Sequence, residues 1–285
     1  MKRTDENTPW LMVITWLLLL QGCFGHGCAV VTDLLTRDAR IPDPLGIHVH
    51  PVMTTTAEVR EVCETTGRVR MEVPDIVVEI VVERVQNAPS DCRFLLVVEE
   101  SLPMSWWAWV RAEPRVEAIQ VGNELNNCGE GWPCWDSTQT ELWLRVNVPR
   151  IRQAAGSKPI VCPAATPLFS DPEAMAWYAR LADTGVLNLC DVQAVHIYGK
   201  PWTSPEKWQA LTDEVHLLAR VGLPVWVTEY GTPEDAEEVE YAARIPALFE
   251  ARGMTVERWY WYAWNDPTLG FELRTGPSPL WKELQ

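Results

Sequence analysis

Two apolar stretches of the sequence each end on a carboxylate. Residues 119–122 have the composition of a strand and run into Asn123 and Glu124, and residues 225–228 run into Glu229. Packing alone gives an apolar strand no reason to end on an acidic side chain. Two carboxylates that face each other across a cleft can act as general acid and nucleophile, the chemistry that cleaves a glycosidic bond. We therefore predict that Glu124 and Glu229 form such a pair.

The elements that would carry these carboxylates alternate between short apolar runs and amphipathic segments. Predicted strands lie at 46–50, 68–73, 94–98, 119–122, 160–162, 192–198, 225–229 and 258–263. Predicted helices lie at 55–66, 75–87, 104–112, 138–155, 172–184, 205–221, 234–252 and 278–284. Eight strand–helix pairs in a chain of this length predict a (β/α)8 TIM barrel, an α/β fold, over residues 45–285. A doubly wound sheet would instead show a Gly-rich turn after an early strand, and the sequence has none.

Local preferences support one of these helices and oppose two others. Thr55 and Glu58 have the spacing of a capping box, which marks the start of a helix. Residues 75–87 are rich in Val and Ile, which favour strands, so the helix there is predicted from the alternation alone. The helix at 138–155 contains Pro149, which predicts a kink or a break.

The barrel would bring the two carboxylates to one place. Functional groups of a (β/α)8 barrel lie at the carboxyl ends of its strands, and Glu124 and Glu229 follow or end the fourth and seventh strands. Glycoside cleavage with retention needs carboxyls about 5–5.5 Å apart, one protonated and one ionised. Burial and the partner's charge would raise the pKa of one carboxyl, and hydrogen-bond donors would keep the other ionised.

Around these residues the sequence resembles the large clan of (β/α)8 retaining glycoside hydrolases, in particular the family 5 cellulase and mannanase group. The resemblance covers about residues 46–285 and rests on motifs at Asn123-Glu124, His196-Ile197-Tyr198, Thr228-Glu229-Tyr230-Gly231 and Trp264. Family 5 members usually have a His shortly after the third strand, and this sequence has Glu99-Glu100 there. His48 or His50 on the first strand would fill similar space.

The resemblance implies a role for each matched residue. Glu124 would be the general acid/base, and Glu229 would be the nucleophile of a retaining β-glycosidase. Asn123 would hydrogen-bond the sugar 2-hydroxyl, Tyr198 would hydrogen-bond Glu229, and Trp264 would form the sugar platform.

Two further residues complete the expected site. His196 would contact substrate at the barrel mouth, and Arg70 on the second strand would lie beneath Glu229 as its positive partner. Arg68 has the same parity along that strand and is the alternative partner. The implied reaction needs no metal and no organic cofactor.

Charge and the first residues bear on partners and location. The formal net charge of −15 argues against a nucleic-acid partner, since phosphates require basic patches. Residues 1–23 resemble an export leader of the signal or lipoprotein type, with an apolar run at 10–20 too short to span a bilayer. Cys23 ends a lipobox-like segment, and its lipidation would anchor the protein to a membrane. Residues 24–44 are interpreted as a linker, and we expect an exported monomer: secreted, periplasmic or lipid-anchored.

The cysteine content also fits export. Eight cysteines are typical of an exported, oxidised protein. Cys128 and Cys134 bracket a short segment with Gly, Trp and Pro, and their spacing suits a local disulfide. Cys162 and Cys190 lie near two successive strands, and we expect them to be buried thiols.

Two alternatives to the hydrolase stay open at this point. A non-catalytic carbohydrate-binding barrel would keep the Trp residues and use the carboxylates only as hydrogen-bond acceptors. A transglycosylase would share every residue named above and would differ in water access. The short loops expected in a barrel of near-minimal length favour attack within a polysaccharide chain.

Overall fold

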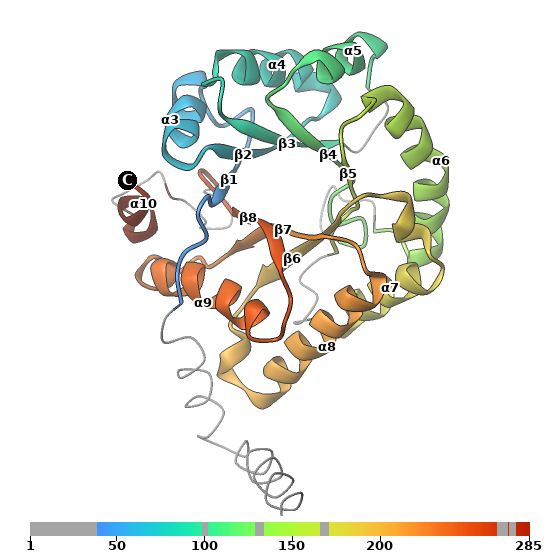
Figure 1. The fold of residues 1–285 in the computed structure, drawn as a ribbon, viewed down its shortest axis with the longest axis vertical. Coiled ribbons are helices and arrows are strands. Elements are labelled where there is room, and N and C mark those ends of the chain that lie inside the picture. The colour runs from blue at the N-terminus through green and yellow to red at the C-terminus, as the bar shows by residue number, and fades with distance from the viewer. Residues whose placement is uncertain (1–38, 99–101, 129–133, 166–170, 267–272, 274–277) are drawn as a thin grey trace, which may run out of the picture.

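The computed structural model describes residues 39–98, 102–128, 134–165, 171–266, 273 and 278–285. Its centre is a sheet of eight parallel strands surrounded by helices (Figure 1). In chain order the strands are β1 (Gly46–Val49), β2 (Arg68–Glu72), β3 (Arg93–Val98), β4 (Val116–Val121), β5 (Ile160–Val161), β6 (Gln193–Tyr198), β7 (Val225–Gly231) and β8 (Val256–Trp261). Their order in the sheet is β5-β4-β3-β2-β1-β8-β7-β6, so β1 pairs with β8.

The remaining gap, between β5 and β6, is also bridged. Val161 and Val192 form a parallel bridge, and the amide of Cys162 donates to the Val192 carbonyl at 2.8 Å. The amide of Asp191 donates to the Ile160 carbonyl at the same distance of 2.8 Å. The sheet is therefore a nearly closed barrel, and the predicted (β/α)8 fold is confirmed.

Eight described helices cover the outside of the barrel (Figure 1). They are α3 (Thr56–Thr66), α4 (Val78–Asn87), α5 (Met104–Ala112), α6 (Ser137–Ala155), α7 (Pro172–Asp183), α8 (Pro205–Val221), α9 (Glu238–Glu250) and α10 (Pro279–Leu284). The predicted capping box is present ahead of α3, where Thr55 and Glu58 bond each other's backbone amides. The predicted helix at α4 is confirmed, because Val81 and Val85 on one of its faces are buried in the core. α6 runs through Pro149 without a break.

Strand β2 shows how the alternation sorts residues between the two sides of the barrel wall. Val69 and Met71 belong to the large core between the strands and the helices. Arg70, between them, points to the opposite side, the barrel interior, where it is fully buried. The interior also holds a smaller apolar cluster made of Leu95, Ala118, Val161, Ala164, Val192, Ala194, Trp226 and Tyr260.

Three disulfides join described cysteines: Cys63–Cys92, Cys128–Cys134 and Cys162–Cys190. The local bridge between Cys128 and Cys134 is confirmed. The prediction of buried thiols at Cys162 and Cys190 is wrong, because these residues are bonded to each other. One follows β5 and the other precedes β6, so barrel closure brings their Cα atoms to 5.5 Å, within disulfide range. Three disulfides are typical of exported proteins.

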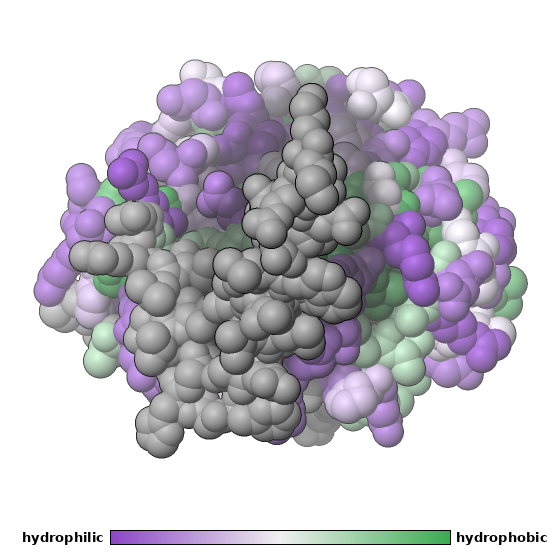
Figure 2. Space-filling model, turned by 60° about the horizontal axis from the view of Figure 1, so that its bottom comes forward, coloured by the Kyte–Doolittle hydropathy of each residue, from purple (hydrophilic) through white to green (hydrophobic). Residues whose placement is uncertain are grey.

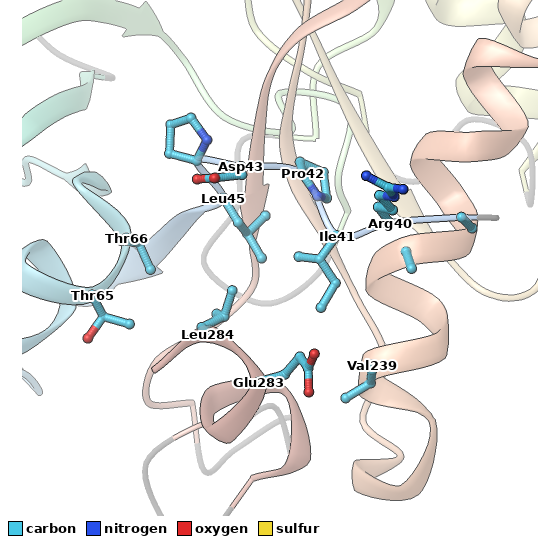
Figure 3. Close-up of a pocket in the computed structure, with 13 residues that line it drawn as sticks. Arg40, Ile41, Pro42, Asp43, Leu45, Thr65, Thr66, Val239, Glu283 and Leu284 are labelled. Atoms are coloured by element: carbon cyan, nitrogen blue, oxygen red, sulfur yellow. The ribbon is translucent and has the colours of Figure 1, made fainter.

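Two cavities among the described residues lie away from the predicted carboxylates. One of about 500 Å³ lies between the segment before β1 and the helices α9 and α10 (Figure 3). The other, of about 600 Å³, lies between the first turns of α4 and α5. The face shown in Figure 2 is mostly hydrophilic where its residues are described, in keeping with the high net charge.

The predicted leader at 1–23, with Cys23, and most of the linker at 24–44 lie outside the described residues. Residues 39–44, the described part of that linker, contain neither helix nor strand. Among the described helices, none combines the length and the apolar character needed to cross a membrane.

Candidate active site

Glu124 reaches the barrel mouth on a turn that directly follows β4. Gly122 has a φ of 76° and Glu124 a φ of 42°, so both lie in the left-handed region. A Cβ on Gly122 would also lie 3.1 Å from the Leu125 side chain, which explains why glycine occupies this position. A positive φ is uncommon for a residue with a side chain, and such backbone is concentrated at functional sites.

Glu229 lies within β7, paired with His196 of β6. The strand register shifts beside both residues, between Val195 and His196 and between Val227 and Tyr230. Irregularities of this kind redirect side chains and are frequent near active sites. Glu229 is 5% exposed and His196 is fully buried, so both face the interior of the barrel mouth rather than bulk water.

His196 lies between the two carboxylates. Its Nδ1 is 2.8 Å from Oε1 of Glu124 and 3.4 Å from Oε2 of Glu229. One carboxylate oxygen of Glu124 and one of Glu229 lie within 4.8 Å of each other. The fold thus brings together three of the residues singled out in the sequence, from the ends of three different strands.

Glu229 accepts a hydrogen bond on each of its oxygens. Nη1 of Arg70 donates to Oε1 at 2.6 Å, and the hydroxyl of Tyr198 donates to Oε2 at 2.6 Å. Burial and then the charge of Glu229 raise the pKa of Tyr198 well above its ordinary value, so the phenol keeps the proton that it donates. Both contacts are the ones expected from the sequence.

Arg70 connects Glu229 to the rest of the site. Its Nη2 donates to Oδ1 of Asn123 at 2.6 Å, and its Nε donates to Oε1 of Gln120 at 3.3 Å. Its Nη1 also contacts Nδ1 of His48. Burial and then the charge of Arg70 hold the pKa of His48 well below its ordinary value, so this imidazole is neutral and accepts from Arg70.

The alternative at Arg68 is not used, because its Nε lies 3.5 Å from Glu117, one layer deeper in the barrel. Glu117 is bound there by Arg258 as well, at 2.7 Å. His48, one of the two first-strand histidines considered as substitutes for the family 5 His, contacts Arg70.

The electrostatics of Glu124 differ from those predicted for a general acid. Burial alone would raise its pKa, but the hydrogen bond and electrostatic effect of His196, together with a hydrogen bond from Asn127, outweigh burial. Nδ2 of Asn127 donates to Oε2 of Glu124 at 2.9 Å. The pKa of Glu124 is therefore lowered in the free protein, and the predicted rise is not found at this residue.

Trp264 is not part of this group of contacts. It is 3% exposed, and its ring packs against Trp281 of α10 with the ring centres 4.6 Å apart. Tyr262 lies nearer to this group, because its ring centre is 6.1 Å from that of Tyr198, which hydrogen-bonds Glu229. The Tyr262 hydroxyl donates to Asp266 at 2.5 Å, which fixes the orientation of its ring.

Sequence reasoning missed four residues near the mouth: Glu72, Gln120, Tyr262 and Asp266. Two of them carry a signal that could have found them. Gln120 is a polar residue inside an apolar strand, and Glu72 has the same parity as Arg70 on β2. Tyr262 and Asp266 carry no such signal, because their positions depend on the path of the chain after β8.

The second half of the chain matches a known family. Residues 136–271 fit the family model described as "Glycosyl hydrolase catalytic core". This match supports a glycoside hydrolase. The matched segment contains His196, Tyr198 and Glu229, whereas Arg70 and Glu124 precede it. None of the curated proteins compared with the chain matches it.

Several solved glycoside hydrolase structures share the fold. A GH5_18 protein from Streptomyces cattleya in complex with GlcNAc has a TM-score of 0.57 and 16% identity, over 82% of this chain and 75% of that one. A variant of a GH128 endo-β-1,3-glucanase from Amycolatopsis mediterranei, in complex with laminaritriose and laminaribiose, has a TM-score of 0.54 and 17% identity, over 82% and 94%. The catalytic domain of a mannanase from Streptomyces sp. SirexAA-E has a TM-score of 0.53 and 15% identity, over 82% and 79%. At these identities the likeness shows the fold alone.

The geometry of the carboxylate pair also raises the question of a metal ion. Glu124, His196 and Glu229 each offer a ligand atom within 4.8 Å of the other two. However, the guanidinium of Arg70 lies 2.6 Å from Glu229, where it would repel a cation. Both oxygens of Glu229 and Nδ1 of His196 already take part in hydrogen bonds. The donor set therefore suits a hydrogen-bonded acid pair better than a metal site.

Proposed function

We propose that this protein is a glycoside hydrolase that cleaves β-glycosidic bonds of a poly- or oligosaccharide with retention of configuration. One observation carries the proposal: an oxygen of Glu124 and an oxygen of Glu229 lie within 4.8 Å of each other at the barrel mouth. Double displacement needs carboxyls about 5–5.5 Å apart, whereas inversion needs about 6.5–9.5 Å to admit a water molecule. The separation favours the former mechanism.

In the first step Glu229 attacks the anomeric carbon and Glu124 gives its proton to the leaving oxygen, so that a glycosyl–Glu229 ester forms as the glycosidic bond breaks. In the second step Glu124 takes a proton from water, which attacks the anomeric carbon and releases Glu229. The hydrogen bonds from Arg70 and Tyr198 orient the carboxylate of Glu229 for this attack. The Oδ1 of Asn123 is bound to Arg70, which leaves its amide N–H groups for the sugar 2-hydroxyl.

Glu124 must hold a proton at the start of this cycle, although its contacts in the free protein lower its pKa. A bound sugar would displace water from the mouth and strengthen the burial that raises the pKa of this carboxyl. His196, which contacts both carboxylates, therefore controls how readily Glu124 becomes the acid.

Carbohydrate ligands in the related structures support a carbohydrate substrate here. The solved relatives bind GlcNAc or β-1,3-glucan fragments, or act on mannan, so they point to no single sugar. For the platform beneath the sugar we favour Tyr262, which lies beside Tyr198, over Trp264, which packs against Trp281 of α10. The reaction proposed here uses side chains of this chain alone.

The proposal is tested by incubating the protein with 2-deoxy-2-fluoro glycosides of glucose, mannose and xylose, and locating the label by mass spectrometry. We expect one sugar on the peptide that contains Glu229. Glu229→Ala should abolish hydrolysis of the matching aryl glycoside, while Glu79→Ala, which changes an exposed carboxylate of α4, should not. A label on another residue, or full activity of Glu229→Ala, would overturn the proposal.

The same measurements separate the two alternatives. A non-catalytic sugar-binding barrel would give neither label nor product. A transglycosylase would give the label on Glu229 but would transfer the sugar to an added acceptor in place of water.

We also propose that residues 1–23 form an export leader, residues 24–44 a linker and residues 45–285 the catalytic unit. The mature protein would be an exported monomer, with a lipid on Cys23 if the leader is of the lipoprotein type. Mass spectrometry of the protein recovered from an expressing bacterium tests this directly. An intact N-terminus on the mature protein would exclude the leader.

A further inference from the structure

Glu72 is the last residue of β2 and lies at the carboxyl end of the barrel wall. Side chains alternate along a strand, so Glu72 is on the same side as Arg70, two residues earlier, which points into the barrel. Met71, between them, packs on the opposite side, in the core beneath the helices. Glu72 therefore faces the mouth one layer above Arg70, on the side from which a substrate enters.

Glu72 has no protein partner among the described residues. It is half-buried, yet no hydrogen bond or ion pair joins it to another part of the described chain. The other carboxylates of the barrel interior differ, because Glu117 is paired with Arg258 and Glu229 with Arg70. A half-buried carboxyl loses much of its hydration and normally recovers it through a hydrogen bond.

Glu72 is also close to the reacting groups. Burial raises its pKa; Arg70 opposes this effect, and the charges of Glu229 and Glu124 add to it. Glu72 in turn contributes to raising the pKa of Tyr262, the aromatic residue beside Tyr198. These effects agree with the position that the strand alternation gives Glu72, on the side of the barrel wall that faces the mouth.

We propose that Glu72 is a substrate-binding residue that accepts hydrogen bonds from hydroxyl groups of the sugar ring attacked by Glu229. This inference rests on the function proposed above. The ring must lie against Glu229 when its anomeric carbon is attacked, and Glu72 faces the same space. A carboxylate can accept from two neighbouring hydroxyls at once, which would replace the hydration that burial removes.

The same charge limits the class of sugar. Glu72, Glu124, Glu229 and Asp266 lie at the mouth, and among the described Lys and Arg side chains Arg70 is the one that forms an ion pair with this group. A sugar that carries its own carboxylate would be repelled at Glu72. The site therefore selects an uncharged ring with free hydroxyls over a uronic acid.

The experiment combines changes in the protein with changes in the substrate. Wild type, Glu72→Ala, Glu72→Gln and the control Glu79→Ala are compared on 2,4-dinitrophenyl β-glycosides of glucose, mannose and xylose. For the best of these, each monodeoxy analogue and the corresponding uronide are also measured. Circular dichroism and thermal midpoints establish that each variant is folded, and Glu72→Gln preserves the shape of the side chain.

We expect Glu72→Ala to lower kcat/KM by about 10- to 100-fold, the usual effect of losing hydrogen bonds to a charged group. The deoxy analogue that lacks the bound hydroxyl should be a poor substrate for wild type, but Glu72→Ala should show no further loss on it. Glu72→Gln should reduce the ratio of kcat/KM for the uncharged sugar to kcat/KM for the uronide. Glu79→Ala should match wild type throughout.

The inference is overturned if Glu72→Ala keeps the wild-type kcat/KM. It is also overturned if every deoxy analogue lowers kcat/KM, relative to the parent sugar, by the same factor in wild type and in Glu72→Ala. Covalent labelling of Glu229 by the fluoro sugar distinguishes this outcome from failure of the proposed function. If wild type is labelled but the effect of Glu72→Ala does not depend on which hydroxyl the substrate lacks, only the role of Glu72 is refuted. Absence of label refutes the retaining mechanism, and the role of Glu72 falls with it.

Discussion

Replacing Arg70 by Met should destabilise the protein strongly, because Arg70 is the cation that neutralises Glu229 inside the barrel. The guanidinium is fully buried, lies 2.6 Å from Glu229, and also donates to Asn123 and Gln120. Breaking a buried ion pair by removing one partner typically costs about 3–5 kcal/mol, because the other charge is left uncompensated. For a barrel of this size that corresponds to a fall in Tm of roughly 6–20 °C.

A second substitution separates this cause from simple loss of packing. Glu229→Gln removes the charge that Arg70→Met leaves behind, so the double variant should recover most of the lost stability while remaining inactive. Thermal and urea denaturation of the four proteins gives the coupling free energy of the pair. The matched control is Arg258→Met, because Arg258 also binds a carboxylate, Glu117 at 2.7 Å, but is 30% exposed. A partly exposed pair of this kind is worth only about 1 kcal/mol or less.

The reasoning fails if the double variant is as unstable as Arg70→Met alone. That result would mean that Arg70 supports the barrel through its shape and its bonds to Asn123 and Gln120, and that the charge of Glu229 needs no buried partner. It also fails if Arg258→Met costs as much as Arg70→Met, since burial would then make no difference.

Three further predictions concern groups around the carboxylate pair. His196→Asn removes the donor that lowers the pKa of Glu124. The alkaline limb of the pH profile of kcat/KM should therefore move to higher pH. An unchanged alkaline limb would contradict the assignment of Glu124 as the acid. Tyr198→Phe removes one hydrogen bond to a charged carboxylate and should lower kcat by about 10- to 100-fold; steady-state rates within twofold of wild type would exclude this role. Replacing Cys162 and Cys190 together by Ala opens a bridge spanning 28 residues and should cost about 3–4 kcal/mol in urea denaturation, whereas an unchanged midpoint would show that the bridge adds nothing.

The barrel could be predicted because each strand–helix pair leaves its own local pattern. The helix at α4 is instructive, since its Val and Ile residues favour a strand. Its position between two predicted strands predicts the helix correctly, because parallel neighbouring strands need a crossover connection. The contacts of Glu229 with Arg70 and Tyr198 were also anticipated, through the resemblance to the clan of retaining glycoside hydrolases.

The errors share a different origin. The bridge between Cys162 and Cys190 depends on the approach of β5 to β6, a closure that neither local segment specifies. The lowered pKa of Glu124 depends on the side-chain directions of His196 and Asn127, and spacing along the chain does not determine these directions. The sugar platform that the resemblance assigned to Trp264 stays a prediction, but the resemblance did not point to Tyr262, which the turn after β8 brings beside Tyr198.

The charged groups inside the barrel differ in whether the protein itself supplies their partners, and this difference follows the barrel axis. It explains why the chemistry takes place at the mouth. In the layer farthest from the mouth, which is partly exposed, Glu117 is paired with Arg68 and Arg258, so its charge is neutralised within the protein. One layer higher, Arg70 binds Glu229. At the mouth, Glu72 has no partner in the described chain. Because buried polar groups are normally satisfied, the groups left without a protein partner at the open end are those that a bound sugar would complete.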